Sequence, residues 1–366
     1  MRVALLTYST KPRGGVVHTL ALAEALARQG CDVDVWTLAR GGDRTFFRSV
    51  DPAVGVHAVP FPEVPAEGVG ARIVRSIDTL AAALADVSYD VVHAQDCISA
   101  NAVLAAGLPC LRTIHHLDTF TTPELVACHD RAVVEPSGHV CVSETVAMEV
   151  AAQFGVRPVV IPNGVDAARF ARAAGPDAAA SRGRWQEELG PYVLALGGIE
   201  PRKGSIDLLE AFALIRRRRP EMRLVFAGGE TLFDYRDYRA AFDRRASELH
   251  LQPALLGVVD DDELPSLVAA ASAMAFVSTK EGFGLAAMEA LAAGVPVVAR
   301  DLPVLREVFG DAVVFASDLM SIAGSLADVL ENPPDPETGR VLARSSSWEA
   351  AASAHLDLYA RHAGRA

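Results

Sequence analysis

Short, fully apolar segments alternate along the chain with longer segments in which apolar residues recur every three or four positions. An apolar run of about four to eight residues predicts a strand buried on both faces of a sheet, and the periodic segments predict amphipathic helices. The strands predicted in the first half are Val3–Thr7, Asp32–Thr37, Val56–Pro60, Val91–Ala94, Cys110–His115, His139–Val142 and Val159–Ile161. Those predicted in the second half lie near Tyr192–Leu196, Arg223–Ala227, Ala254–Leu256, Ala273–Val277, Val297–Ala299 and Ala312–Phe315. Helices are predicted between the strands, for example at Val16–Arg28, Val69–Ala85, Ser205–Arg218, Tyr235–Leu249 and Leu285–Ala293.

Two such sets of strands and helices predict two Rossmann-like domains, each with a parallel sheet covered by helices. The turn signal IPNG ends the first set, so we expect an N-terminal domain at residues 1–165 and a C-terminal domain at residues 166–346. Residues 167–190 carry no strand pattern and are expected to form a linker with a short helix. After a break at NPPDPETG, the helical spacing of residues 347–364 predicts a last helix that packs back on the first domain.

The acidic charge balance limits the classes of partner. Lys+Arg total 34 and Asp+Glu total 46, which gives a net charge of −12. We therefore expect no nucleic-acid partner, because a phosphate backbone needs a basic face. The run Arg216–Arg219 ends a predicted helix, where the helix dipole favours cations, and the alternative is contact with an anionic membrane surface.

Features of the sequence also suggest a compartment. Met1–Tyr8 resembles a strand rather than a signal peptide, and no apolar run reaches the length of a membrane span. The 5 cysteines form no CxxC pair, so a disulfide framework or a zinc site is not expected. These features favour a cytoplasmic protein with buried free thiols.

Loops that follow strands are the candidate sites, because facing α/β domains bind ligands in their cleft at the carboxyl ends of the strands. In the first half, Gly14 and Gly15 precede a helix and leave backbone N–H groups open to an anion. His115 and His116 end a predicted strand, and because adjacent side chains on a strand point to opposite sides, one of the two is expected at the site. Ser143 is the predicted N-cap of the next helix, and a cap at the cleft can also contact a ligand.

In the second half, Arg202 and Lys203 lie in the glycine-flanked loop GGIEPRKG before a helix. The helix dipole disfavours cations at that end, so we expect both side chains to face an anion such as a diphosphate. The order Lys-Gly-Ser excludes a Walker A loop.

The segment EGFGLAAME places Glu281 in a loop and Glu289 in the helix that follows. Its glycines leave N–H groups open at the helix start, and carboxylates accept hydrogen bonds from the paired hydroxyls of a sugar or a ribose. The run Asp260–Asp262 is expected to be the N-cap and first turn of a helix at Glu263–Ala270 rather than a metal site.

Together these motifs resemble glycosyltransferase family 4, the retaining nucleotide-sugar enzymes with the GT-B fold. The resemblance extends over nearly the whole chain and is carried by GGIEPRKG, EGFGLAAME, the leading Gly-Gly loop, Thr113–His115 (T-x-H), Val142–Glu144 (VSE) and Ile161–Asp166 (IPNGVD). It implies an α/β fold of two Rossmann-like domains facing across a cleft. The second histidine, His116, departs from the commoner family pattern.

The resemblance also implies residue roles. Arg202 and Lys203 would neutralise the donor diphosphate, and Glu281 would bind hydroxyls of the donor sugar. Glu289 would hold the ribose, and His115 would lie by the sugar. The remaining donor contacts implied are Gly14, Gly15, Ser143, Gly198, Val258, Phe283, Gly284 and Leu285.

The function implied is that of a retaining hexosyltransferase that moves a sugar from a nucleotide-diphosphate sugar, with UDP the expected nucleotide, to an acceptor that the sequence does not identify. No cofactor and no metal are expected, because Arg202 and Lys203 supply positive charge for the leaving diphosphate. The alternatives left open are a GT-B-like epimerase, a phosphorylase and a catalytically silent protein that binds sugar nucleotides.

Overall fold

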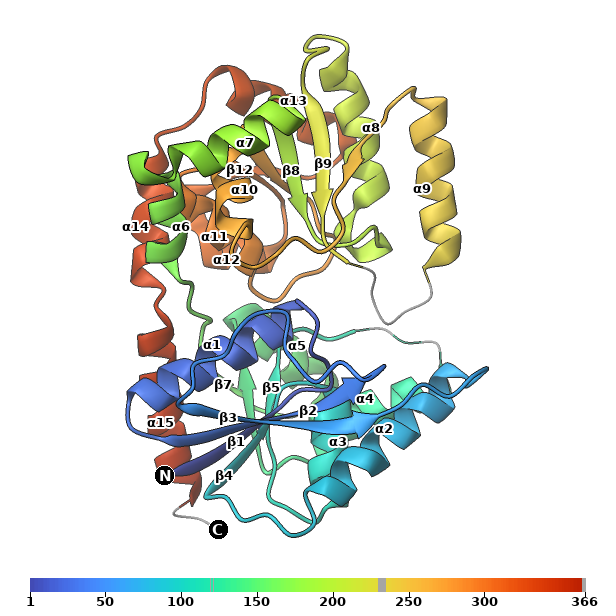
Figure 1. Cartoon of the computed structure of the whole chain (residues 1–366), viewed down its shortest axis with the longest axis vertical. Coiled ribbons are helices and arrows are strands. Elements are labelled where there is room, and N and C mark those ends of the chain that lie inside the picture. The colour runs from blue at the N-terminus through green and yellow to red at the C-terminus, as the bar shows by residue number, and fades with distance from the viewer. Residues whose placement is uncertain (119, 121, 230–234, 364–366) are drawn as a thin grey trace. The chain divides into compact units, whose positions relative to one another are not determined.

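The apolar runs form two parallel sheets in the computed structural model, which describes residues 1–118, 120, 122–229 and 235–363 (Figure 1). The chain divides into two units: Met1–Gly164 together with the segment from Trp348, and Val165–Ser347. Each unit is a sheet with helices on both faces, so the expected pair of Rossmann-like units of a GT-B fold is confirmed.

The strands of the first unit lie in the order β3-β2-β1-β4-β5-β6-β7. Their bounds are β1 Arg2–Leu6, β2 Asp32–Arg40, β3 Val54–Phe61, β4 Val91–Ala94, β5 Leu111–Ile114, β6 Gly138–Cys141 and β7 Val159–Val160. Its helices are α1 Gly14–Arg28, α2 Val69–Ala83, α3 Cys97–Ala105, α4 Pro123–Val134, α5 Glu144–Phe154 and α15 Trp348–Ala363. The central strands β1 and β4 are almost wholly buried, which is why their sequences, apart from Arg2 and His93, are continuously apolar rather than alternating.

The last helix belongs to the first unit. Helix α15, red in Figure 1, packs against α1. It contributes Trp348, Ala352, His355 and Tyr359 to the buried interior, and the Tyr359 hydroxyl lies 2.7 Å from His93 Nδ1 on β4. The predicted return of the C-terminal helix to the first domain is therefore confirmed, although position 364, its predicted end, lies outside the described residues.

The second unit has the strand order β10-β9-β8-β11-β12-β13. Its strands are β8 Tyr192–Leu196, β9 Arg223–Ala227, β10 Ala254–Leu255, β11 Ala273–Phe276, β12 Val297–Arg300 and β13 Val314–Ala316. Its α-helices are α6 Ala167–Ala174, α7 Ala179–Leu189, α8 Ser205–Arg216, α9 Arg236–Glu248, α10 Leu264–Ala270, α11 Leu285–Ala293, α12 Pro303–Phe309, α13 Leu319–Glu331 and α14 Pro336–Ser345. Single 3-10 turns are η1 Pro176–Ala178, η2 Pro201–Lys203 and η3 Gly310–Ala312. A core of side chains from β8, β9, β11, α8 and α13 fills one face of this sheet.

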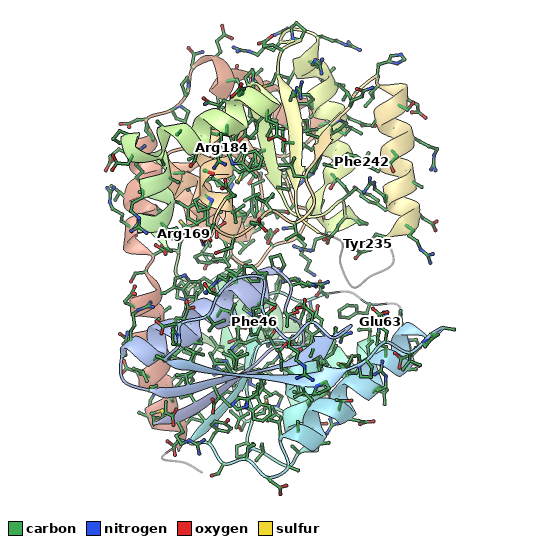
Figure 2. All side chains as sticks on the ribbon, viewed as in Figure 1. Phe46, Glu63, Arg169, Arg184, Tyr235 and Phe242 are labelled. Carbon is green, nitrogen blue, oxygen red and sulfur yellow. The ribbon has the colours of Figure 1, made fainter. Side chains whose placement is uncertain are left out.

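The segment expected to be a linker is a helical one. Instead of one short helix it forms α6 and α7, with η1 between them. The indole N–H of Trp185 on α7 donates to Ser266 Oγ on α10 at 3.0 Å, and Arg184, labelled in Figure 2, pairs with Glu263 at 3.1 Å. These tertiary contacts hold a helix whose own sequence lacks an apolar stripe.

No helix in the described part of the chain is both long and apolar enough to cross a membrane.

Candidate active site

The loops that carry the predicted cations and carboxylates follow neighbouring strands. Arg202 and Lys203 come after β8, and Glu281 comes after β11, the strand beside β8. The strand order reverses between β8 and β11, since β9 lies on the far side of β8. Open α/β sheets bind ligands at the carboxyl ends of strands at such a reversal, so the fold itself places these loops where a ligand site forms.

Glu281 forms ion pairs with both cations. Its Oε1 atom lies 2.7 Å from Lys203 Nζ and 3.2 Å from Arg202 Nη1. Arg202 also donates to the Lys280 carbonyl at 3.2 Å, and the Thr279 N–H donates to the Arg202 carbonyl at 2.7 Å. The two loops are thereby joined into one structure, and the side chains of Arg202 and Lys203 remain 28% and 21% exposed.

The electrostatic balance at Glu281 strongly favours its ionised form. Burial on its own raises the pKa of this carboxyl, but the charges of Lys203 and Arg202 outweigh burial. With hydrogen bonds from Lys203 and Ser278 they bring the pKa of Glu281 down to about 2. The carboxylate therefore stays ionised and holds both cations in place at neutral pH.

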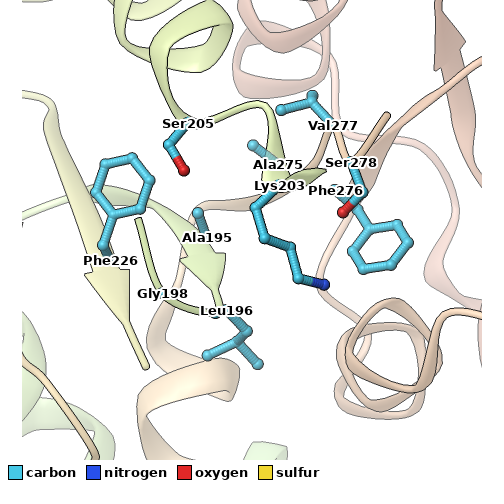
Figure 3. Close-up of a pocket in the computed structure, with 11 residues that line it drawn as sticks. Ala195, Leu196, Gly198, Lys203, Ser205, Phe226, Ala275, Phe276, Val277 and Ser278 are labelled. Carbon is cyan, nitrogen blue, oxygen red and sulfur yellow. The ribbon is translucent and has the colours of Figure 1, made fainter. Parts of the chain in front are cut away.

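Close backbone packing shapes the floor of this site. A Cβ atom at Gly198 would lie 2.5 Å from the Gly229 carbonyl, so the loops after β8 and β9 can approach this closely only with glycine at position 198. A small pocket here is lined by Gly198, Lys203, Ser205, Phe226, Phe276 and Ser278, among others (Figure 3). The Lys203 ammonium lies 5.6 Å from the centre of the Phe276 ring, a cation–π distance.

The start of α11 leaves its first-turn N–H groups without a side-chain cap. Its N-cap is Gly284, at φ 104°, and a Cβ there would lie 2.9 Å from Phe309 and 3.2 Å from Phe276. Phe283 is 6% exposed and packed inward, and Leu285 is partly exposed. The uncapped N–H groups and the helix dipole favour an anion at this end of α11.

Glu289 lies in the second turn of α11 and is partly buried. Burial raises the pKa of its carboxyl to about 8, with Asp261 and Asp166 adding to the rise and Arg169 opposing it. Arg169, labelled in Figure 2, is itself paired with Asp261 at 2.8 Å. A carboxyl that is easily protonated accepts or donates hydrogen bonds readily, which suits a diol ligand.

The acidic run before α10 differs from the sequence prediction. The helix begins at Leu264, with Glu263 at its N-cap position and no side-chain cap, so Asp260–Asp262 is neither cap nor first turn. The Asp261 carboxylate is instead paired with Arg169 on α6 at 2.8 Å. Among the described residues, no group of three or more His, Cys, Asp or Glu is placed to hold a metal ion.

Val258 follows β10 on an exposed loop and is 52% exposed. A Cβ at Gly229 would lie 2.7 Å from its Cγ2 atom, so the loops after β9 and β10 touch. The Gly257 carbonyl accepts a hydrogen bond from the Gly228 N–H at 2.7 Å, which fixes the loop that carries Val258.

In the first unit the structure brings two predicted residues together. A Cβ at Gly15 would lie 3.6 Å from Nε2 and Cδ2 of His115, so the His115 ring packs on the Gly14–Gly15 loop. Arg13 takes the N-cap position of α1 without making a side-chain cap, so the N–H groups at the start of α1 are open. Ser143 caps α5 as predicted, accepting the Val146 N–H at 3.4 Å.

His115 adjoins a cluster of buried histidines that sequence reasoning missed. The rings of His115 and His18 are 4.8 Å apart and edge-on, and His18 also meets Trp348 and His355 of α15. Burial lowers the pKa of His18 to about 3 and that of His355 to about 4, so both rings are neutral. His18 Nδ1 donates to Asn163 Oδ1 at 2.8 Å, since an amide oxygen can only accept. The neutral His18 ring therefore packs directly against the His115 ring.

The second histidine of the pair has a different partner. His116 Nε2 lies 3.1 Å from Asp118 Oδ1, and both side chains are partly exposed. The structure therefore separates the two neighbours, with His115 against the glycine loop and His116 paired with a carboxylate.

Comparison with known proteins agrees with this arrangement. Residues 12–169 match the family model described as Glycosyltransferase Family 4, and residues 180–344 match the one described as Glycosyl transferases group 1. The chain is 31% identical to the phosphatidyl-myo-inositol mannosyltransferase of Mycobacterium tuberculosis, over 100% of this chain and 98% of that protein. The chain belongs to glycosyltransferase family 4.

Other known proteins are also similar to this glycosyltransferase. The D-inositol 3-phosphate glycosyltransferase of Salinispora tropica is 29% identical over 98% of this chain and 85% of its own length. Among solved structures, the sucrose-phosphate synthase of Thermosynechococcus elongatus superposes with a TM-score of 0.81 at 20% identity, covering 100% of both chains. The Anabaena protein HepE, solved with UDP and glucose, gives 0.77 at 19% identity over 99% of this chain and 100% of its own. At such identities the structural matches establish the fold.

Proposed function

We propose that this glycosyltransferase takes its sugar from a nucleotide-diphosphate sugar, with UDP as the nucleotide. The observation that carries the proposal is the pairing of Lys203 and Arg202 with Glu281 beside the uncapped start of α11. Two fixed cations and a set of free N–H groups at a strand-order reversal suit a diphosphate. Support also comes from the fold neighbour HepE, whose structure contains UDP and glucose.

The proposed roles follow the chemistry of each group. Lys203 and Arg202 stabilise charge on the diphosphate, and Glu281 accepts hydrogen bonds from sugar hydroxyls. Glu289 takes the ribose diol. The N–H groups of Phe283, Gly284 and Leu285 contact sugar or phosphate, with Gly198 and Val258 at the diphosphate and the base. From the first unit, His115 contacts the sugar, and Gly14, Gly15 and Ser143 contact the donor.

The proposed reaction is a substitution at the anomeric carbon with retention of configuration. The bond between that carbon and the diphosphate oxygen breaks, and a bond to an acceptor hydroxyl oxygen forms on the same face. The acceptor proton goes to the departing diphosphate. Arg202 and Lys203 stabilise the negative charge on that diphosphate, so the proposed reaction uses no metal ion.

We infer that the acceptor is a polyol that carries a phosphate. The support comes from two relatives, a phosphatidyl-myo-inositol mannosyltransferase and a D-inositol 3-phosphate glycosyltransferase.

Replacement of Lys203 tests the donor site. The Lys203→Ala chain should lose about 100-fold or more of its UDP-sugar turnover, measured as UDP release from UDP-glucose, because it loses one of two charges at the leaving group. Lys203→Gln, which can still donate to Glu281, separates charge from packing. The control is Lys11→Ala, since Lys11 pairs with Asp43 at 2.6 Å in the first unit and its side chain is 62% exposed.

Lys203→Ala and Lys203→Gln should unfold at a lower temperature than the unaltered chain, because Lys203 is the main charge that offsets the burial of Glu281, but both should remain folded at the assay temperature. Lys11→Ala should unfold close to the unaltered chain. Turnover by Lys203→Ala and Lys203→Gln that matches the control, with both variants folded, would refute the proposed diphosphate site. Equal weak binding of UDP-, GDP- and ADP-glucose would refute the choice of uridine.

A further inference from the structure

A set of arginines and aromatic rings lies at the carboxyl ends of β1, β2 and β3, and none of the roles above uses it. We name it the arginine–aromatic cluster and define it by its residues, Tyr8, Arg13, Arg40, Phe61, Arg72 and Arg75. These strands form one half of the first unit's sheet, up to the point where the strand order reverses between β1 and β4. The cluster therefore occupies the edge at which open α/β sheets bind ligands.

Guanidinium groups and rings stack in sequence through the cluster. The Arg13 guanidinium carbon lies 5.8 Å from the Tyr8 ring centre, and that of Arg40 lies 5.4 Å from the same ring. The guanidinium carbon of Arg40 is also 5.0 Å from the Phe61 ring centre, and that of Arg75 is 3.8 Å from the same centre. The rings hold the planar guanidiniums in fixed orientations, as an anion site requires.

The charges in the cluster are not balanced. Arg75 is matched by Glu67 in a two-pronged pair of 2.6 and 2.7 Å, and Arg40 bonds to the Tyr8 carbonyl and to Ser76. Arg13 donates to the Tyr8 hydroxyl at 2.8 Å but has no carboxylate partner among the residues that the structure describes. In the same described ranges, the Arg72 guanidinium makes no hydrogen bond or ion pair.

Nearby carboxylates leave this excess in place. Asp96, whose charge acts on Arg40 and Tyr8, already accepts hydrogen bonds from the Tyr8 N–H at 2.9 Å and from Ser99 at 2.8 Å. The carboxylate of Glu124 lies close to Gly70 at the start of α2 and, within the described chain, forms no ion pair with Arg72. Burial and the neighbouring charges of Arg72 and Arg13 lower the pKa of Arg40. The guanidiniums thus repel one another in a protein whose overall charge is −12.

Tyr8 adds a neutral donor. Burial, opposed by Arg13, raises the pKa of its phenol to about 12, so the hydroxyl keeps its proton. Its oxygen accepts from Arg13, and among the described residues no acceptor takes its hydrogen.

We propose that the arginine–aromatic cluster binds the phosphate group of the acceptor, through Arg13, Arg72 and the Tyr8 hydroxyl. A phosphate monoester offers three terminal oxygens and more than one negative charge, and the phosphodiester of a lipid headgroup offers two oxygens that share one charge. Either form can accept hydrogen bonds from two uncommitted guanidinium forks and a hydroxyl donor. This inference rests on the proposed function, because it takes the bound phosphate to belong to the acceptor and not to the nucleotide.

The ligand could reach the cluster free in solution or as a lipid headgroup, and the shared chemistry is a phosphate ester of a polyol. The probes are D-inositol 3-phosphate, unphosphorylated myo-inositol and phosphatidylcholine vesicles with and without phosphatidylinositol. The protein is the full chain, unaltered or with Arg13→Gln and Arg72→Gln combined. The control is Arg157→Gln, because Arg157 is exposed and lies at the opposite, amino end of β7 in the same unit.

The unaltered chain should show at least one of two preferences of about ten-fold or more. One is for D-inositol 3-phosphate over myo-inositol, and the other is for vesicles that contain phosphatidylinositol over vesicles of phosphatidylcholine alone. The double variant should lose that preference, and Arg157→Gln should keep it. Whichever phosphorylated probe shows the arginine-dependent preference identifies the source of the ligand. UDP binding should be equal in all three proteins, because the cluster is not part of the proposed donor site.

Equal affinity of the double variant and the unaltered chain for the phosphorylated probes would overturn the proposal. So would failure of the unaltered chain to bind either probe, or equal binding to vesicles that carry phosphatidylglycerol instead, since that would indicate general charge attraction. Loss of the donor function is a separate result: a chain that binds no UDP-sugar but shows arginine-dependent phosphate binding retains this site and lacks the function proposed above.

Discussion

The pair of cations on Glu281 makes the stability of the second unit depend on pH in a defined way. The pKa of Glu281 falls from the usual 4.5 to about 2 in the folded chain. Because the folded value is depressed, the stabilisation is fully present above pH 4.5 and is lost as the pH falls through about 2. A shift of this size is worth about 3 kcal/mol at pH 7 and about 1 kcal/mol at pH 3.

Glu281→Gln removes the titrating group and leaves Lys203 and Arg202 without their counter-charge. We expect this variant to be about 3 kcal/mol less stable than the unaltered chain at pH 7, and the gap to shrink by about 2 kcal/mol at pH 3. Hydrogen exchange of peptides from β8 and β11, followed by mass spectrometry at both pH values, reports the opening of this unit alone. That separation matters because a chain of two units need not unfold in one step.

A matched control is Glu331→Gln, at the exposed end of α13 in the same unit. This change should leave the exchange rates of β8 and β11 unaltered at either pH. A gap between Glu281→Gln and the unaltered chain that is the same at pH 7 and pH 3 would show that the ionised carboxylate contributes nothing. The loss would then come from packing alone, and the electrostatic account of this site would be wrong.

Two further changes in the second unit have opposite expected signs. Burial raises the pKa of Glu289 from 4.5 to about 8, so the folded chain keeps its full stability below pH 4.5 and loses part of it as the pH rises to 8. The free energy of unfolding of Glu289→Gln, from the same exchange measurement, should therefore exceed that of the unaltered chain by on the order of 1–3 kcal/mol at pH 9 and differ little from it near pH 4. A constant difference across that range would contradict the raised pKa. Gly284→Ala should cost about 1–3 kcal/mol, since its φ of 104° and the 2.9 Å approach of a Cβ to Phe309 both oppose a side chain. By contrast, a Cβ at Gly324, an exposed position on α13, meets nothing within 4 Å, so Gly324→Ala should stabilise the unit by about 0.5–1 kcal/mol. Thermal unfolding that ranks the two glycine variants the other way would refute the steric reasoning.

The fold was predictable because buried parallel strands leave a local record in the sequence. The strand at Val91–Ala94 is wholly apolar except for His93, and the structure has it with the predicted bounds. The loops that carry Arg202 and Glu281 were also found, since glycines and charges after an apolar run mark a strand end. Their mutual pairing was not, because the two positions are 79 residues apart and pattern reasoning treated each loop separately.

What the sequence could not show depends on tertiary contacts. Helix α7 has a mostly polar sequence with no apolar stripe, and it is held by the bond from Trp185 to Ser266 on another helix. The partner of Asp261 is 92 residues away, at Arg169, so an acidic run that resembles a helix start serves an ion pair instead. The arginine–aromatic cluster is assembled from three strand ends and one helix, and no segment of it carries a recognisable motif.

The return of α15 to the first unit has a consequence for how the chain is made. The second unit is continuous, so all of its residues have left the ribosome once Ser347 has emerged. Synthesis of the first unit begins earlier, but Trp348, His355 and Tyr359 are added only after the second unit. Until then His18 lacks its contacts with Trp348 and His355, and His93 lacks its hydrogen bond with Tyr359. The usual order, in which the N-terminal domain is finished first, is therefore reversed. A nascent chain that stalls late carries a finished second unit and an open histidine cluster in the first.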